Sequence, residues 1–112
     1  MTLVVAVEAL RRSEMSALFE GAKHGGVEIS MFVTTWPTGR GPGLHKHPYP
    51  EVFLVEAGEA VFTVDGDEQR VAADHIVVVG ADTSHRFHNP GTSPLRVLSV
   101  QPSPVVVQTD LV

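Results

Sequence analysis

The stretch from Gly39 to Gly58, GRGPGLHKHPYPEVFLVEAG, carries most of the information about the fold, because it sets two histidines and a glutamate at short spacing. Side chains two residues apart point to the same face of a β-strand, so His45 and His47 look the same way, and Glu51 shares their parity. Two imidazoles and a carboxylate that converge can hold a transition metal, and a third imidazole from the distant His85 would complete the set.

Two prolines interrupt this pattern between the second histidine and the glutamate. Pro48 and Pro50 cannot donate ladder hydrogen bonds, so this part of the chain must lie at a sheet edge or in a bulge. A single bulge would reverse the parity from His47 to Glu51. The residues alone therefore support Glu51 as a ligand less strongly than they support His45 and His47.

The composition describes one small folded domain of 112 residues, with 43% hydrophobic and 19% charged residues. The net charge of −5 argues against nucleic acid and anionic membranes as partners, because both bind basic surfaces. The chain contains no cysteine, so a metal site must use nitrogen and oxygen ligands. The lack of cysteine also fits a cytoplasmic location, which is the expectation.

Short apolar runs punctuated by glycine and proline predict an all-β, antiparallel sandwich or barrel. The predicted strands are 3–7, 27–35, 52–56, 60–64, 69–71, 75–79, 86–88, 95–101 and 105–108. Asp65-Gly66 predicts a two-residue hairpin, because both positions of that turn need a positive φ.

The N-terminal part contains the only predicted helix. Met15, Leu18 and Phe19 fall at helical spacing and predict one short helix over Arg12–Glu20. The apolar run Leu3–Val7 is too short to cross a membrane and is expected to form a strand instead.

The first stretch also matches a family motif at every defined position: Gly39, five residues, His45-Lys46-His47, three residues, Glu51, six residues and Gly58. On these residues the chain resembles the cupin superfamily. The resemblance covers roughly residues 35–90 and places them in a single domain spanning residues 1–112.

The second cupin motif is matched only at its end, by His85 and Asn89. Its beginning departs from the family pattern. With His85 aligned, Asp74 stands at the first glycine, His75 at the aspartate, Gly80 at the proline and Asp82 at the second glycine. The hairpin turns are therefore expected to differ, while the ligand position is kept.

The resemblance implies an antiparallel cupin, or jelly-roll, barrel in which His45, His47, Glu51 and His85 bind one divalent transition metal. Fe(II) is the first choice, and Zn(II), Ni(II), Mn(II) and Cu(II) are alternatives, since nitrogen and oxygen ligands suit all of them. Cupins with one motif pair are often homodimers, so a homodimer is expected. The apolar ends of the chain and the two-sided apolarity of residues 75–79 favour the same state.

Residues near the motifs are candidates for binding a small molecule. Phe53, Val55 and Phe87 share parity with the ligands and are expected either to line an apolar pocket or simply to pack the core. Arg40 could pair with a substrate carboxylate or remain solvated. Tyr49 could donate a proton or a hydrogen bond to a bound ligand.

The remaining histidines are not expected to bind the metal. His88 lies three residues from His85, which on a strand places it on the opposite face, toward solvent or an interface. His75 begins a predicted strand, and His24 sits in a glycine-rich segment, so both are expected at the surface.

These features predict a metal-binding protein that acts on a small, largely apolar organic molecule with an oxygen donor. The first hypothesis is a metal-dependent enzyme of the oxygenase, isomerase or cyclase type. The alternative is a non-catalytic binding protein or sensor, because no acid or base is evident beyond the metal ligands and Tyr49. A purely structural dimeric barrel is a third, weaker hypothesis. Cupin membership does not choose among them, since one fold hosts many reactions.

Overall fold

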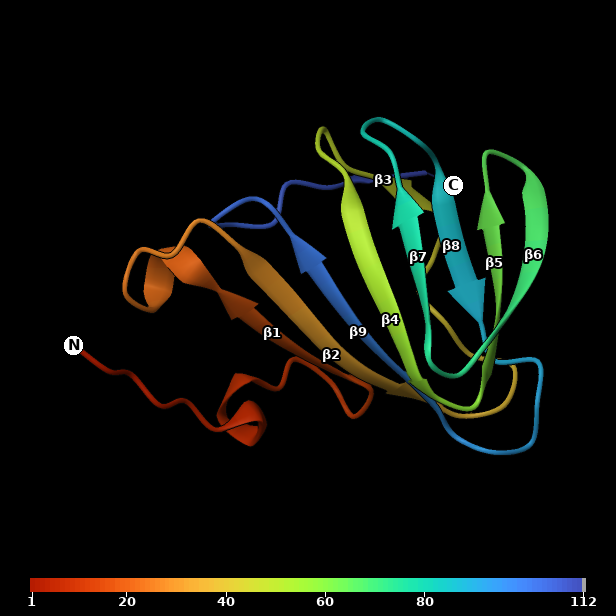
Figure 1. Ribbon diagram of the computed structural model, residues 1–112, viewed down its shortest axis with the longest axis horizontal. Helices are drawn as coiled ribbons and strands as arrows, with labels where there is room; N and C mark the ends of the chain where they lie inside the picture. Colours follow the sequence, from red (N-terminus) through yellow and green to blue (C-terminus); the bar gives the residue numbers. More distant parts are fainter. Residues whose placement is uncertain (112) are drawn as a thin grey trace.

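The computed structural model describes residues 1–111, and these residues form an all-β structure (Figure 1). The regular elements within that range are ten strands and two short 3-10 turns. In chain order they are η1 (Val7–Leu10), β1 (Ser16–Glu20), η2 (Gly21–Lys23), β2 (Ser30–Trp36), β3 (His45–Lys46), β4 (Glu51–Ala57), β5 (Glu59–Val64), β6 (Asp67–Ala72), β7 (His75–Val79), β8 (His85–His88), β9 (Leu95–Gln101) and β10 (Thr109–Asp110).

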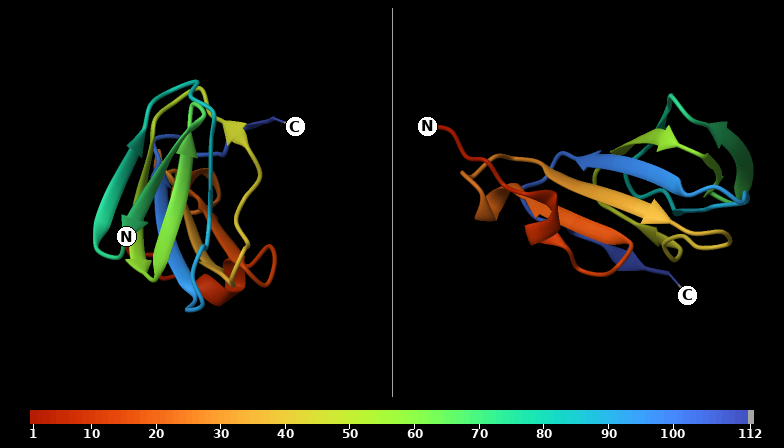
Figure 2. Two further views of the ribbon diagram at one scale, coloured as in Figure 1. Left: turned by 90° about the vertical axis from the view of Figure 1, so that its right-hand side faces the viewer. Right: turned by 90° about the horizontal axis from the view of Figure 1, so that it is seen from below.

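The strands form two five-stranded sheets. The first sheet has the order β1-β2-β9-β4-β7 and the second the order β10-β3-β8-β5-β6. All their pairings are antiparallel. Figures 1 and 2 show β5, β6 and β8 facing one end of the first sheet, while β1 and β2 extend beyond them. This is the expected jelly-roll architecture.

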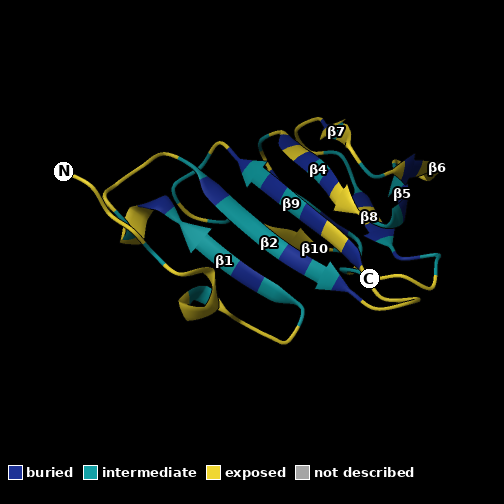
Figure 3. Ribbon diagram, turned by 60° about the horizontal axis from the view of Figure 1, so that its bottom comes forward, coloured by how far each residue is buried: buried dark blue, intermediate teal, exposed yellow. Residues whose placement is uncertain are grey.

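A compact apolar cluster fills the space between the sheets, because alternate residues of each strand point inward. Figure 3 shows the resulting alternation of buried and more exposed positions along β4 and β9. The cluster consists of Trp36, Phe53, Val55, Ala60, Phe62, Val71, Val79, Phe87, Leu95 and Val97. Four aromatic rings occupy its centre, and Phe53 meets Phe62 edge to face at 5.2 Å.

The turns explain how the second motif works without its usual glycines. Asp74 and Asp82, which stand at the two glycine positions, have φ values of 65° and 54°. Aspartate tolerates this left-handed region better than most residues, so both turns can form with aspartate in place of glycine. The predicted β5–β6 hairpin is confirmed, with φ values of 49° at Asp65 and 84° at Gly66.

The Asp82 backbone N–H donates to the carbonyl of His47 at 2.7 Å. This bond ties the turn before β8 to the loop that carries the second histidine of the first motif.

The prediction of a helix over Arg12–Glu20 was wrong. Residues Ser16–Glu20 form β1, which pairs with β2 over its full length. The spacing of Leu18 and Phe19 three and four residues after Met15 was compatible with a short helix, but pairing with a neighbouring strand satisfies the same backbone groups and buries Ala17. Tertiary contacts thus outweighed local spacing.

The predicted strand at Leu3–Val7 is also absent, and the chain there is irregular up to the 3-10 turn η1. Within the first four residues, Val4 is almost fully exposed. The predicted strand 105–108 is replaced by the two-residue strand β10 at Thr109–Asp110, which pairs with β3. None of the helical segments in residues 1–111 is long and apolar enough to span a membrane.

Candidate metal centre

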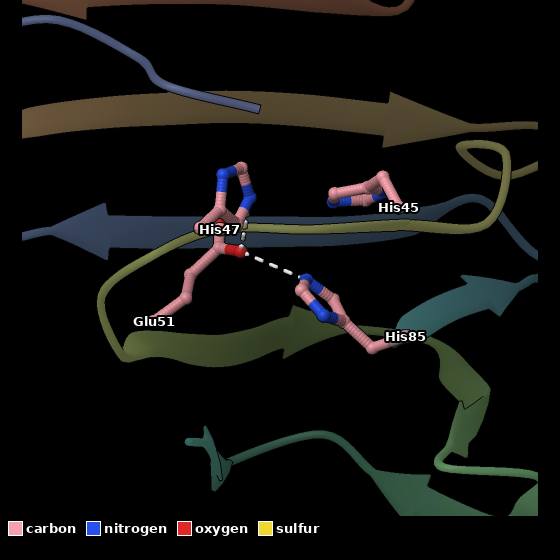
Figure 4. A group of neighbouring side chains, drawn as sticks. All are labelled: His45, His47, Glu51 and His85. Carbon is pink, nitrogen blue, oxygen red and sulfur yellow. Dashed lines mark hydrogen bonds and ion pairs between the residues drawn. The ribbon is translucent and has the colours of Figure 1, made fainter. Parts of the chain in front are cut away.

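Four buried side chains converge between the two sheets. His45 lies on β3, His47 follows that strand, and Glu51 and His85 are the first residues of β4 and β8. All four are at most 7% exposed, and one ligand atom from each lies within 4.8 Å of the others. Figure 4 shows the three rings and the carboxylate pointing toward a common centre. The cluster joins residues up to forty positions apart, as the motif spacing predicted.

The backbone fixes which ring nitrogen of each histidine faces the centre. The Nδ1 atom of His45 lies 2.7 Å from the Gly43 carbonyl, and that of His85 lies 2.8 Å from the Thr83 carbonyl. The Nδ1 atom of His47 lies 2.8 Å from the carbonyl of Val107. A carbonyl oxygen can only accept, so each Nδ1 carries the hydrogen and each Nε2 is left with its lone pair. Such hydrogen bonds from Nδ1 to a backbone carbonyl orient the imidazoles of metal sites toward the metal.

The inner atoms are arranged for a cation. The Glu51 Oε1 atom lies 3.1 Å from His85 Nε2 and 3.2 Å from His47 Nε2 (Figure 4). A carboxylate oxygen facing two lone pairs is repulsive unless a proton or a metal ion lies between them. Among residues 1–111, the Nε2 atom of His47 is the buried side-chain nitrogen left without a hydrogen-bond partner. A metal ion would satisfy it, so the donor set fits the group that the sequence implies.

The close contacts within the cluster shift the pKa values of its side chains. Burial alone would raise the pKa of Glu51, but the close imidazoles of His47 and His85 and the hydrogen bond from Gln101 outweigh it and lower that pKa to about 2. Burial opposes the charged form of His47, yet the Glu51 carboxylate and the Val107 carbonyl raise the pKa of His47. Burial lowers the pKa of His45, aided by the neighbouring imidazoles. Glu51 is therefore ionised throughout the physiological range.

Hydrogen bonds from residues outside the cluster hold Glu51 in place. Gln101 donates from Nε2 to Glu51 Oε2 at 3.0 Å, and it accepts at Oε1 from the Tyr49 hydroxyl at 2.5 Å. The same hydroxyl accepts from the Val107 backbone N–H at 2.9 Å, and the Tyr49 ring stacks on His47. Tyr49 thus supports two ligands from behind, with its hydroxyl held between Gln101 and Val107.

A cavity of about 200 Å³ opens beside the cluster. His45 and Glu51 form part of its wall, so a bound metal would be reachable from it. The apolar wall includes Phe32, Trp36, Phe53, Phe87 and Val97. The polar lining includes Arg12, Ser16, Thr34, Ser99, Gln101, Gln108 and Asp110. The site is therefore not packed solid, and its lining is more polar than the sequence predicted.

The structure distributes the sequence-predicted pocket residues among three environments. Phe53 and Phe87 line the cavity. Val55 is fully buried in the core and is not among the lining residues. Arg40 is exposed and outside the lining, with its backbone paired to Pro37 and Asn89. Tyr49 lies behind the ligands rather than in the cavity wall.

Of the other histidines, His75 lies at the surface as expected, whereas His24 and His88 are half-buried. His88 is half-buried, and it alternates with the buried His85 and Phe87 along β8. His75 is exposed, and its Nδ1 atom faces the backbone carbonyls of Ala72 and Ala73. His24 is half-buried against the ring of Phe19.

Sequence reasoning missed several residues of the site. Ser99 and Gln101 are inward-facing polar residues on β9, which was predicted correctly as 95–101. Their parity with Leu95 and Val97 was the available signal, because a polar side chain at a core position needs a reason. Arg12 gave no such signal, since it was assigned to a helix that does not form.

Asn89, the last residue of the second motif, holds the loops that frame the cavity. Its side chain is buried, and its Nδ2 donates to the carbonyls of Trp36 and Ser93 at 2.9 and 2.8 Å. Its Oδ1 accepts from the Gly91 N–H. This single side chain therefore joins the end of β2 to the turn after β8, which explains its place in the motif.

The comparisons with known proteins agree with this geometry. The chain is similar in structure to oxalate decarboxylase of Bacillus subtilis, a protein with Mn(II) centres, at 23% identity and a TM-score of 0.78, over 89% of this chain and 29% of that one. It is also similar to a formate complex of Lactobacillus farciminis oxalate decarboxylase, at 22% identity and a TM-score of 0.78, over 90% of this chain and 32% of that one. The chain thus spans about a third of the length of these proteins. The profile of the cupin domain family matches residues 31–101, well over half of the sequence, and the chain belongs to the cupin family.

Proposed function

We propose that this protein is a metal-dependent cupin enzyme acting on a small organic molecule that coordinates the metal through oxygen. The observation that carries the proposal is the contact between the ligand cluster and the cavity, since His45 and Glu51 belong to both. When bound, a divalent ion would act as a Lewis acid that polarises an oxygen of the ligand. His45, His47, Glu51 and His85 would hold that ion.

The cavity limits the size and character of the molecule. Its volume of about 200 Å³ lies below the range common for drug-sized ligands, so it suits a molecule of modest size. Phe53, Phe87 and Trp36 supply an apolar wall, and Gln101 fixes Glu51 at the floor. The apolar wall would exclude water from the face of the ligand that packs against it, which strengthens electrostatic interactions at the metal.

The identity of the metal is part of this proposal. Three imidazoles and one carboxylate suit octahedral Fe(II) or Mn(II), which would keep two positions open for the ligand. Fe(II) was the first choice from the sequence, but no contact in residues 1–111 favours it over Mn(II). Because a structurally similar oxalate decarboxylase has Mn(II) centres, Mn(II) is the ion to test first.

A non-catalytic binding protein or sensor is the second candidate, and one observation favours it. The Tyr49 hydroxyl is committed to Gln101 and Val107, so Tyr49 supplies no free proton donor to the cavity. On this reading Tyr49 contributes by positioning the ligands, and a molecule would bind at the metal without being converted.

The two candidates separate in one experiment. The full chain is loaded anaerobically with Mn²⁺ or Fe²⁺ and offered small oxygen-bearing molecules, with binding followed by calorimetry and conversion by NMR. Binding with conversion supports the enzyme, and binding without conversion supports the sensor. If metal-loaded protein binds none of a broad panel of alcohols, diols, ketones and acids, both readings fail.

Variants of the wall test whether the cavity is the binding site. Phe53→Glu is expected to abolish ligand binding while metal binding remains, because it places a charge in the apolar wall. Phe32→Glu, at a half-buried position of the same cavity, serves if Phe53→Glu does not fold. Arg86→Glu is the matched control, since Arg86 is exposed on β8 and faces away from the cavity.

We also propose a homodimer that buries the outer face of the first sheet. Two rows of apolar residues cross all five strands there, in the registers Phe19, Met31, Val100, Val52, Val78 and Ala17, Val33, Leu98, Leu54, Ile76. The part over β7 is open to solvent, with Ile76 66% and Val78 69% exposed. Ala17, at the other edge of the sheet, is already buried, so a second copy would cover the open apolar part over β4 and β7, where Val52 is 41% exposed.

A further inference from the structure

We propose that Arg12 and Ser99 form a carboxylate-binding subsite in the metal cavity, and that the ligand is a small monocarboxylate whose second oxygen group reaches the metal. This inference rests on the proposed function, because it concerns the same cavity, and it names the chemical class of the ligand. It is carried by two side chains of the lining whose hydrogen-bonding capacity is unused.

Arg12 is held beside the cavity by two contacts but forms no ion pair within residues 1–111. It lies just before β1, and its backbone N–H donates to the Ser16 carbonyl at 2.9 Å. Its guanidinium carbon stands 5.9 Å from the centroid of the Phe32 ring, a cation–π contact that holds it over the cavity wall. Within residues 1–111, no carboxylate lies within 4.0 Å of this guanidinium, whereas the neighbouring Arg11 pairs with Glu8 at 2.7 Å.

Ser99 offers the second contact. It is only 3% exposed and lines the cavity, and its hydroxyl makes no hydrogen bond with another side chain or backbone group of residues 1–111. By contrast, the nearby Thr34 hydroxyl donates to the Val97 carbonyl and accepts from Trp36. The buried side-chain atom without a partner among residues 1–111 is His47 Nε2 and not the Ser99 hydroxyl, so this hydroxyl opens to the cavity and can donate to a ligand there.

The register of the first sheet places these groups in order. Ser99 lies opposite Phe32 on one side and Phe53 on the other, so its side chain stands between two aromatic walls. Gln101 lies two residues from Ser99 on β9, and Glu51 lies two residues from Phe53 on β4, all on the same inward face. A ligand that reaches the metal with one end would therefore lie over Ser99, with its other end toward Phe32 and Arg12.

The charges of the cavity favour one negative charge on the ligand. A divalent ion and the ionised Glu51 leave about one positive charge, and Arg12 at the rim is balanced by Asp110, which also lines the cavity. Within the described lining, Arg12 is the one cationic side chain. Its planar fork matches the geometry of a carboxylate, which a lone metal ion would not orient.

A matched pair of small chelators tests the inference. The metal end is kept constant in 3,4-dihydroxybenzoate and 3,4-dihydroxybenzamide, which differ only in charge at the opposite end. Both are titrated anaerobically into the full Mn²⁺-loaded chain by calorimetry. The acid is expected to bind about tenfold more tightly than the amide, a modest ratio because Arg12 is partly open to solvent.

Variants assign that preference to its residues. Arg12→Ala is expected to bring the two affinities within about twofold of each other, and Arg11→Ala, one residue earlier and already paired, is expected to keep the difference. Ser99→Ala is expected to weaken the acid about fivefold while leaving the metal content unchanged.

The outcomes separate this inference from the proposed function. If acid and amide bind equally to the wild-type protein, the carboxylate subsite is refuted and the metal cavity stands. A preference for the acid that survives Arg12→Ala refutes the assignment to Arg12. If neither compound binds to protein with a full metal content, the carboxylate subsite is refuted, and the proposed function then depends on the broad panel of oxygen-bearing molecules.

Discussion

Replacing Gln101 by leucine is expected to weaken metal binding although Gln101 is not itself a ligand. The change removes the hydrogen bond to Glu51 Oε2 at 3.0 Å and leaves the Tyr49 hydroxyl without its acceptor at 2.5 Å. Gln101 is fully buried, so water cannot readily replace it. A bond to a charged group contributes about 1.5–3 kcal/mol and a neutral one about 0.5–1.5 kcal/mol, which gives a loss of about 2–4 kcal/mol in the unfolding free energy.

Part of that loss should appear in the affinity for the metal. Removing a hydrogen bond behind a ligand typically lowers metal affinity about 10–100-fold, and Gln101 holds the only carboxylate of the cluster. We would measure the Kd for Mn²⁺ by competition with a chelator, and stability by urea unfolding of the metal-free protein. Gln69→Leu is the control, because Gln69 is exposed on β6 and the substitution is the same.

A double-mutant cycle with Tyr49→Phe tests whether the two residues act as one unit. If Tyr49 acts only by holding Gln101, the double variant should lose about 1 kcal/mol less than the sum of the single variants. A Kd for Mn²⁺ within about twofold of wild type in Gln101→Leu would refute the reasoning. So would a Tyr49→Phe variant with normal metal affinity and lost turnover, since that result would place Tyr49 in proton transfer.

Four further predictions concern the ligands, pH and assembly. His47→Ala should lower metal affinity more than about 100-fold. His88→Ala should leave metal affinity unchanged, because His88 alternates with inward-facing residues on β8. An equal loss of metal affinity in both variants, measured by chelator competition, would contradict the parity argument. Metal affinity should rise about tenfold per pH unit below the raised pKa of His47 and level off above it, because the ion displaces the proton that His47 carries at low pH. Glu51 does not contribute to this slope, since it stays ionised down to a pH of about 2. A metal affinity independent of pH between 5.5 and 7 would contradict this prediction. In metal-free protein, the depressed pKa of Glu51 should add stability above its usual value of 4.5 that is lost as pH falls toward about 2, and urea unfolding of Glu51→Gln should lack this loss. Val78→Asp should dissociate the proposed dimer, and light scattering of the wild type at a mass near 12 kDa across micromolar concentrations would refute the dimer itself.

The sequence by itself determined the strands with a strong local signal. Asp65-Gly66 specified its hairpin because few residues adopt positive φ at two successive positions, and β7 and β9 were bounded correctly at His75–Val79 and Leu95–Gln101. The motif spacing also identified the four residues that the fold brings together. This worked because the parity of a strand and the family motif constrain the same positions.

Tertiary structure decided everything that depends on which strand lies beside which. Residues Ser16–Glu20 became β1 because β2 offered them an edge, although their spacing also suited a helix. The polar lining of the cavity could not be predicted from the sequence for the same reason. Arg12, Ser99 and Glu51 come from three distant segments, and sheet order sets which segments are neighbours. The role of Tyr49 likewise depended on Gln101 and Val107, more than fifty residues away. Local sequence encodes conformation and facing, whereas the partners of a side chain are fixed only when the sheets pack.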